Sequence, residues 1–183
     1  PPTYLTEDEK RTLLKTIRSH KGWHANRDLV IVTLFLHTGI RLSELVNLDI
    51  ADVNVLEKRI TIRAKGGQIV HRFLNSKVRT ALNRYLKKRK RVFVESKALF
   101  ISQLEGRITT RQVQRRLEQW VAKADITKRV TPHTLRHSFA TSVYARTSNL
   151  LAVQQALGHA SVVTTQIYAH LLDETLEEAL ETL

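Results

Sequence analysis

Apolar residues recur at helical spacing along most of the chain. A capping-box pair, Thr6 and Glu9, precedes the first such run and predicts a helix over 6–17. The next run, RDLVIVTLFLHTG (27–39), is strongly apolar, so we expect a buried central helix that ends at Gly39. The same spacing predicts further helices over 41–48, 76–91, 109–124, 133–146, 149–158 and 162–170.

The pattern changes to that of β-strands in the middle of the chain. RITIRA (59–64) and IVHRFL (69–74) are rich in β-branched residues and are joined by a short segment, 65–68, with glycines at its tip. This pattern predicts an antiparallel hairpin. ALFIS (98–102) is a further short extended piece. We therefore expect one domain with an α+β fold, mainly α-helical with a small three-stranded antiparallel sheet.

Composition excludes several classes of function. The 183 residues include no cysteine, which rules out disulfides, thiolate catalysis and cysteine-ligated metals. No apolar stretch is long enough to span a bilayer, and no charged-then-apolar leader opens the sequence. We therefore expect a cytoplasmic protein with no membrane partner. The first residue is Pro1 rather than Met, which favours a piece of a longer protein.

Charge points to a polyanionic partner. Lysine and arginine number 30 against 17 acidic residues, a formal net charge of +13. The final stretch, DETLEEALETL (173–183), holds five acids and no base, so the rest of the chain has 30 bases against 12 acids, or +18. A basic body binds phosphates through sequence-independent contacts that release counterions. Nucleic acid is the favoured partner, and a solubilising basic surface is the alternative.

The segment TPHTLRHSFA (131–140) carries the first candidate site. On a helix, His133 and Arg136 share one face near the N-terminus, where anions bind favourably. His133 and His137 are four residues apart and could instead hold a metal ion. However, Thr134 stands where a zinc hydrolase has its glutamate, and an arginine between the ligands would repel a dication. A phosphate site is thus favoured over a metal site, and ordinary structural histidines are the third interpretation.

A second arginine lies at a predicted corner between two helices. In HTGIRLSEL (37–45), Gly39 ends one helix and Arg41 follows two residues later. Glu44, three residues further on, could orient Arg41 by an ion pair, although a plain surface pair is the simpler interpretation. Two arginines from distant segments can clamp the oxygens of one phosphodiester, because each guanidinium offers parallel donors and is always charged.

The segment LGHASVVTTQIYAH (157–170) contributes two more candidates. His159 comes directly after a glycine, and Tyr168 follows nine residues later. A tyrosine in a helix is more often an amphipathic filler than a reactive group. Spacing alone therefore does not single out Tyr168.

Four motifs together resemble the catalytic domain of tyrosine recombinases, the phage-integrase and Xer group. They are TGIRLSEL, the AKGG hairpin, TPHTLRHSFAT and LGHASVVTTQIYAH, in this order and spacing. The resemblance runs from about residue 3 to residue 171, and the C-terminal third looks most like Xer-type recombinases. It implies the tyrosine recombinase catalytic-domain fold and an enzyme, a DNA strand transferase, that cuts and rejoins DNA at specific sites.

The resemblance also implies the site residues. Tyr168 matches the nucleophile, which forms a covalent 3′-phosphotyrosyl link and frees a 5′-hydroxyl. Glu44 matches an acidic residue that supports the site. No cofactor or metal is implied, because fixed cations stand in for a metal. The complete catalytic set would be Arg41, Lys65, His133, Arg136, His159 and Tyr168.

Each remaining member of the set has an implied role. Arg41 and Arg136 would stabilise charge on the phosphoryl oxygens in the transition state. Lys65, at the hairpin tip, would protonate the leaving 5′-oxygen. His133 and His159 would hydrogen-bond the phosphate and manage the tyrosine proton. Two alternatives use the same residues or fewer: type IB topoisomerase-like relaxation of DNA, and a DNA-binding module without catalysis.

The resemblance divides the chain into a catalytic domain, 1–171, and a tail helix, 172–183. The family's N-terminal core-binding domain is absent from this chain. Expected partners are double-stranded DNA and other copies of the protein, which would form a dimer to tetramer on DNA. The resemblance also allows an accessory or partner recombinase. The tail would dock on a neighbouring protomer or close its own domain, because it has an apolar stripe: Leu172, Leu176, Ala179, Leu180 and Leu183.

Overall fold

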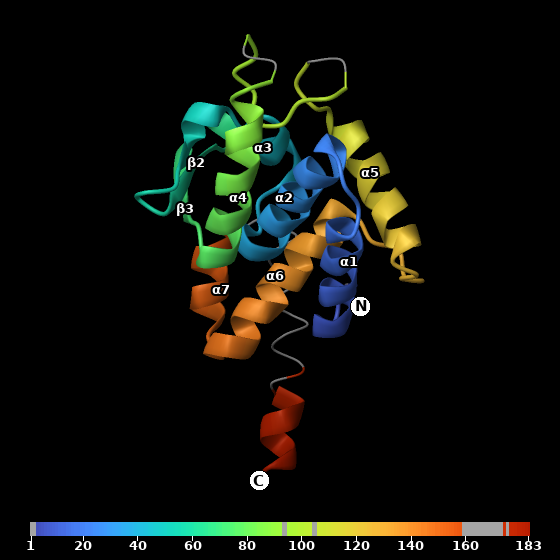
Figure 1. Cartoon of the computed structure of the whole chain (residues 1–183). Coiled ribbons are helices and arrows are strands. Elements are labelled where there is room, and N and C mark those ends of the chain that lie inside the picture. Colours follow the sequence, from blue (N-terminus) through green and yellow to red (C-terminus); the bar gives the residue numbers. More distant parts are fainter. Residues whose placement is uncertain (1–2, 93–94, 104–105, 159–173, 175) are drawn as a thin grey trace.

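The computed structural model describes residues 3–92, 95–103, 106–158, 174 and 176–183. These residues form the expected α+β fold, mainly helical with one three-stranded antiparallel sheet (Figure 1). The predicted helix over 162–170 lies outside the described residues. The longer helices are α1 (Glu7–Arg18), α2 (Trp23–Thr38), α4 (Ser76–Arg89), α5 (Thr110–Lys123), α6 (Pro132–Thr147) and α7 (Leu150–Leu157), with a short α3 (Leu42–Val46).

Helix α2 is the buried centre of the fold, as its apolar sequence predicted. It packs against α1, α4, α5 and α6 (Figure 1). It begins at Trp23, earlier than the expected 27, because Gly22 occupies the N-cap with a φ of 110°. It ends at Gly39, whose φ of 64° is the left-handed conformation of a glycine C-cap. The core around it includes Leu34, Phe35 and Leu45, each at most 1% exposed.

The sheet has the order β1-β2-β3, with β1 (Val53–Asn54), β2 (Arg59–Arg63) and β3 (Ile69–Phe73). The β2–β3 pair confirms the predicted hairpin. The location of the third strand was not predicted, because β1 is two residues long and has no alternating pattern. The extended piece at 98–102 is not a strand of this sheet. It forms isolated bridges, Asp49 with Ala98 and Ile101 with Arg107.

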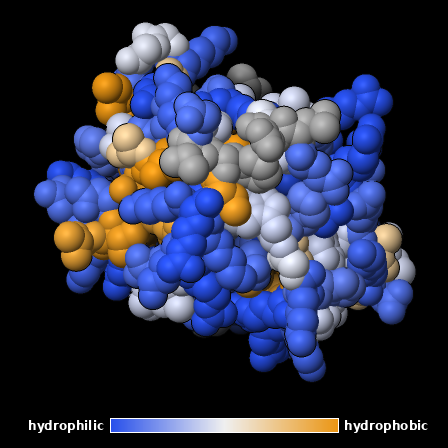
Figure 2. Space-filling model, turned by 45° about the horizontal axis from the view of Figure 1, so that its top comes forward, coloured by the Kyte–Doolittle hydropathy of each residue, from blue (hydrophilic) through white to orange (hydrophobic). Residues whose placement is uncertain are grey.

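The hairpin leaves apolar side chains in solvent. Ile69 is 62% exposed and Phe73 is 67% exposed, both on β3. In Figure 2 hydrophilic residues dominate the face shown, and hydrophobic atoms gather on the left, the side where Figure 1 places the hairpin. The hairpin is therefore packed on one face only.

A buried carboxylate fixes α5 against α2. Asp28 accepts hydrogen bonds from the Arg116 Nε at 2.7 Å and from the Trp120 Nε1 at 2.8 Å, and it pairs with Arg27. Because Asp28 is only 2% exposed, its charge depends on these partners. This network holds α5, whose first turns line the candidate site described below, against α2.

No helix in the part of the chain described here is long and apolar enough to cross a membrane.

Replacing Gly39 by alanine is expected to destabilise the fold by roughly 2 to 4 kcal/mol. The new Cβ would take a left-handed conformation and lie 2.4 Å from the Phe139 ring. Urea unfolding followed by circular dichroism measures the loss. Gly106→Ala is the matched control, since no heavy atom of the described residues lies within 4 Å of the Cβ it adds. A Gly39→Ala protein as stable as this control would contradict the tight packing of α2 on α6.

Candidate active site

Arg41 lies at the sharp corner between α2 and α3. Gly39 turns the chain, and Arg41 occupies the N-cap of α3 with an extended backbone. The Arg41 backbone N–H donates to the Glu44 carboxylate at 3.0 Å. The expected Arg41–Glu44 side-chain ion pair is absent from the contacts of these two described residues, so that expectation is wrong. Glu44 instead acts on the main chain, because the carboxylate of an N3 residue reaches back to the N-cap N–H.

His133 and Arg136 lie on the first turns of α6. Thr131 caps this helix: its Oγ1 accepts from the Thr134 N–H, and Pro132 fills the first helical position. Three positions along a helix return to nearly the same face, so His133 and Arg136 point to the same side. They lie at the N-terminal end of the helix, whose partial positive charge favours an anion.

One cavity of about 690 Å³ joins the corner and α6. Arg41 contributes from the corner, and His133 and Arg136 contribute from α6. The remaining lining residues are Ile40, Leu42, Ser43, Thr110, Gln114, Thr131 and Pro132. The structure therefore brings together three residues that are up to 95 positions apart in the sequence.

Arg136 is held in place by two helix ends. It is only 4% exposed, its Nη1 donates to the Gly39 carbonyl, and its Nη2 donates to the Leu157 carbonyl at 3.1 Å. These carbonyls lie at the C-termini of α2 and α7, which carry partial negative charge. These two bonds fix the guanidinium, which also lines the cavity.

The surroundings of the His133 imidazole favour its neutral form. Burial lowers its pKa from the ordinary value, and the nearby charges of Arg136 and Arg41 lower it further. A neutral imidazole can accept a proton as well as donate a hydrogen bond. His137 is 5% exposed, as expected for a packed core histidine, and its ring centroid lies 4.6 Å from that of His133.

The residues described here contain no cluster of three or more His, Asp or Glu side chains that could hold a metal ion. The His133 and His137 rings are tilted by 50° to each other, and Arg136 lies between these residues in the sequence.

Other predicted site residues lie apart from this cavity or beyond what the structure describes. Lys65 is exposed in the turn between β2 and β3 and does not line the cavity. His159 and Tyr168 lie outside the described residues. The geometry therefore places Arg41, His133 and Arg136 together, with Glu44 supporting the corner.

Sequence reasoning missed two kinds of residue. Thr110 and Gln114, from the first turns of α5, line the cavity. The polar start of the α5 helix carried no signal that set it apart from any other N-terminus. Arg72 of β3 binds backbone carbonyls next to the site. An arginine in an inward position of a strand was a signal that could have found it.

Two guanidinium groups and a neutral imidazole at a helix N-terminus form a site suited to a phosphate or phosphodiester. The arginines supply permanent charge and several donors, and the imidazole supplies a group that can exchange a proton.

Comparison with known proteins gives consistent matches. The model of the phage integrase family matches residues 3–175. The tyrosine recombinase XerC of Vibrio cholerae serotype O1 is 40% identical over 146 residues, which make up 79% of this chain and 47% of that protein. The chain thus spans about half the length of the curated relatives it matches.

Solved structures match as well. The crystal structure of XerA recombinase has a TM-score of 0.85 and 38% identity, covering 99% of this chain and 65% of that one. The XerH site-specific recombinase, in a post-cleavage complex with its palindromic difH substrate, has a TM-score of 0.82 and 30% identity, covering 98% of this chain and 52% of that one.

Proposed function

The chain belongs to the phage integrase family, and we propose from this membership that it is the catalytic part of a site-specific DNA recombinase. The observation that carries the proposal is the cavity in which Arg41, His133 and Arg136 meet. Its charges suit one phosphodiester, and the basic body of the chain suits the rest of a DNA duplex. A DNA substrate would place the protein in the cytoplasm.

In the proposed reaction the Tyr168 phenolic oxygen attacks a DNA phosphorus atom. A bond forms between that oxygen and phosphorus, and the bond from phosphorus to the 5′-oxygen breaks, which leaves a 3′-phosphotyrosyl link and a 5′-hydroxyl. Because the phosphodiester is exchanged rather than hydrolysed, its energy is kept for rejoining by a second 5′-hydroxyl.

The other residues handle charge and protons. Arg41 and Arg136 offset the negative charge that builds up on the non-bridging oxygens. Neutral His133, with His159, receives the phenolic proton, and Lys65 donates a proton to the leaving 5′-oxygen. Glu44 has a supporting part, because it fixes the backbone from which Arg41 projects.

DNA relaxation of the topoisomerase type would use the same chemistry without exchanging partners. The recombinase reading is preferred because the matched relatives are named as recombinases: XerC by sequence, and XerA and XerH by structure. Strand exchange needs a second copy of the chain, so we include a homo-oligomer on DNA in the proposal.

The function is tested with nicked suicide duplexes taken from a randomised pool. The intact chain should become covalently linked to one class of duplex, and the linkage should form equally well in EDTA. Adduct on denaturing gels, mapped to a 3′-phosphate, is the measurement. An activity that is lost in EDTA and restored by zinc would favour a metal site on His133 and His137 instead.

We further propose that the tail docks on a second copy of the chain. The described tail residues are exposed, including Leu176 at 58%, Leu180 at 57% and Leu183 at 101%. Their neighbours are acidic, so the tail is an amphipathic segment of opposite charge to the body. An exposed leucine stripe is stabilised when it is buried against another surface.

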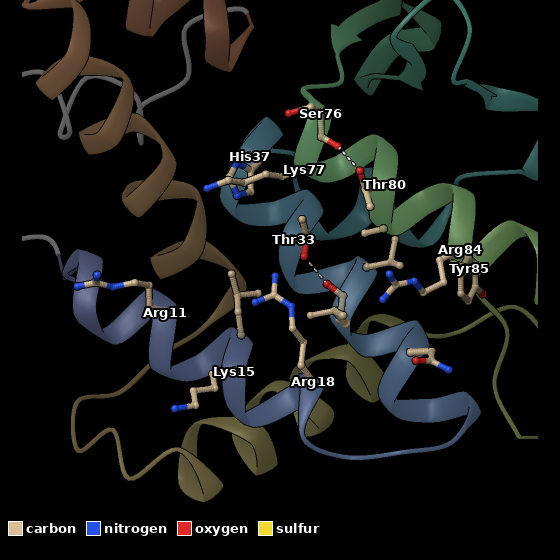
Figure 3. Close-up of a pocket in the computed structure, with 15 residues that line it drawn as sticks. Arg11, Lys15, Arg18, Thr33, His37, Ser76, Lys77, Thr80, Arg84 and Tyr85 are labelled. Atoms are coloured by element: carbon tan, nitrogen blue, oxygen red, sulfur yellow. Dashed lines mark hydrogen bonds between the residues drawn. The ribbon is translucent and has the colours of Figure 1, made fainter.

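A cavity of about 690 Å³ between α1, α2 and α4 offers such a surface (Figure 3). Half-buried apolar side chains form part of its lining, among them Leu14, Leu29 and Ala81. Its rim is basic, with side chains from α1 and α4: Arg11, Lys15, Arg18, Lys77 and Arg84 (Figure 3). This combination of apolar lining and cationic rim complements the leucines and acids of the tail.

Changing Leu180 to aspartate should weaken assembly on paired DNA sites by at least about tenfold, which corresponds to about 1.4 kcal/mol. Binding to a single site and the unfolding temperature should stay unchanged, because Leu180 is exposed. Gel-shift titrations on one-site and two-site DNA measure both. Leu151→Asp, at a similarly exposed leucine of α7, is the control. Equal assembly by both variants would rule out docking through the tail.

A further inference from the structure

Arg72 is a charged residue on the inward face of the sheet. In the β2–β3 register it lies opposite Ile60, which is fully buried, and two positions from Val70 on the same strand. Alternation along β3 turns Val70 and Arg72 toward the protein, while Ile69 and Phe73 face solvent. A guanidinium in such a place needs specific partners, because burying an unpaired charge is costly.

The partners of Arg72 are backbone carbonyls at two helix ends. Its Nη1 donates to the Thr38 carbonyl at 3.2 Å and to the Ala156 carbonyl, and its Nη2 donates to the Leu157 carbonyl at 2.7 Å. Thr38 is the last residue of α2, and Leu157 is the last residue of α7. The two helices therefore end against a single side chain from the sheet.

Electrostatics explains why a cation lies there. Two helix C-termini that meet bring like partial charges together, and a cation near those carbonyls is stabilised. Burial lowers the pKa of Arg72, the Glu44 carboxylate raises it, and Arg41 lowers it, which also identifies its charged neighbours. An arginine stays protonated in spite of such burial.

Arg72 and Arg136 bind the same two helix ends. Both donate to the Leu157 carbonyl, and at the end of α2 Arg72 donates to the Thr38 carbonyl while Arg136 donates to the adjacent Gly39 carbonyl. The end of α2 leads directly into Arg41. One guanidinium from the sheet and one from α6 thus tie together the segments that deliver the phosphate-binding arginines.

The approach of Arg72 to α7 depends on Gly158. A Cβ at this residue would lie 3.0 Å from the Arg72 Nη2, and the φ of 81° already favours glycine. The C-cap of α7 is therefore shaped to admit the guanidinium.

We propose that Arg72 is a positioning residue for the phosphate clamp. It does not line the cavity. It acts through the carbonyls that it shares with Arg136 and through the corner that carries Arg41. This inference rests on the proposed recombinase function. A shift of about 1 Å in a catalytic group costs on the order of a hundredfold in rate, so a residue that fixes the clamp affects the chemical step rather than DNA binding.

The test compares Arg72→Met with Arg89→Met in the full chain. Arg89 is fully buried and likewise donates to backbone carbonyls, those of Ala98 and Ser96, but it lies on α4 away from the cavity. The probe is the nicked duplex that gives the most adduct with the intact chain, made once as the ordinary phosphodiester and once with a methylphosphonate at the cleaved position. A methylphosphonate lacks the charge of one non-bridging oxygen, so its transition state needs less stabilisation from Arg41 and Arg136.

With saturating DNA, Arg72→Met should form adduct roughly 10 to 100 times more slowly than the intact chain on the phosphodiester. On the methylphosphonate the difference should shrink to about threefold or less, because less charge has to be stabilised. The DNA dissociation constant should change by less than about twofold. Arg89→Met should lower the unfolding temperature and show the same relative rate on both probes.

Arg72→Lys keeps the charge but cannot reach all three carbonyls, so it should fall between the intact chain and Arg72→Met with the same dependence on the probe. Arg72→Lys tests the positioning role by itself if Arg72→Met does not fold. Equal losses on both probes, or a lysine variant that matches the intact chain, would overturn the positioning role. If the intact chain itself forms no adduct, the result contradicts the proposed recombinase function on which the role of Arg72 rests.

Discussion

A chain with phenylalanine at position 168 should bind DNA like the intact chain and form no covalent adduct. The phenolic oxygen is the atom proposed to bond to phosphorus, and phenylalanine lacks it while keeping the ring. The proposed covalent bond cannot form without this oxygen, so the expected loss exceeds about ten-thousandfold, the scale seen when a catalytic nucleophile is removed. Denaturing gels of a suicide-substrate reaction measure the adduct, and a gel shift measures binding.

Tyr144→Phe is the matched control for this prediction. Tyr144 lies on α6 and is half-buried, packed against the smaller hydrophobic cluster. Its variant should cleave nearly as the intact chain does. An adduct that survives in Tyr168→Phe would assign the nucleophile to another residue, and Tyr144 would be the next one to examine.

Replacing Arg136 by lysine should slow adduct formation by about a hundredfold or more, equivalent to roughly 3 kcal/mol of transition-state stabilisation. Lysine keeps the charge, but an ammonium cannot donate to the Gly39 and Leu157 carbonyls and still offer paired donors to a phosphate. Single-turnover rates at saturating DNA isolate the chemical step. The DNA dissociation constant should stay within a few fold, because the rest of the basic surface is unchanged.

Arg146→Lys is the control on the same helix, since Arg146 is exposed near the end of α6. It should react at the rate of the intact chain. A rate for Arg136→Lys within a few fold of this control would mean that Arg136 acts as a point charge, and that its two carbonyl contacts do not set its geometry.

Periodicity predicted most of the fold because most of it is local. The α1 cap at Thr6 and the stop of α2 at Gly39 follow from side-chain and backbone preferences of a few residues. The strand β1 was missed for the opposite reason. Its two residues gain their conformation only from pairing with β2, and such pairing leaves no trace in a short sequence window.

The residues of the candidate site likewise fall into those that local sequence predicted and those that depend on tertiary contacts. Arg41, His133 and Arg136 were identified because they belong to recognisable motifs, and the cavity that they share confirms that they meet. The hypothesis of a side-chain ion pair between Arg41 and Glu44 came from their spacing of three residues, whereas the Glu44 carboxylate binds the Arg41 backbone N–H. Arg72 was missed since its role depends on two helix ends that come together only in the folded chain.

The cavity draws its walls from residues near 41, near 110 and from 131 to 136, and this has a consequence for synthesis of the protein. Loops of tens of residues must close before these walls meet, and the cost of that closure is recovered only when α6 packs on α2. A nascent chain that has emerged only as far as α5 has half of the clamp and no way to hold a phosphodiester. The cavity that joins Arg41 to Arg136 therefore forms late in translation, together with the cooperative closing of the domain.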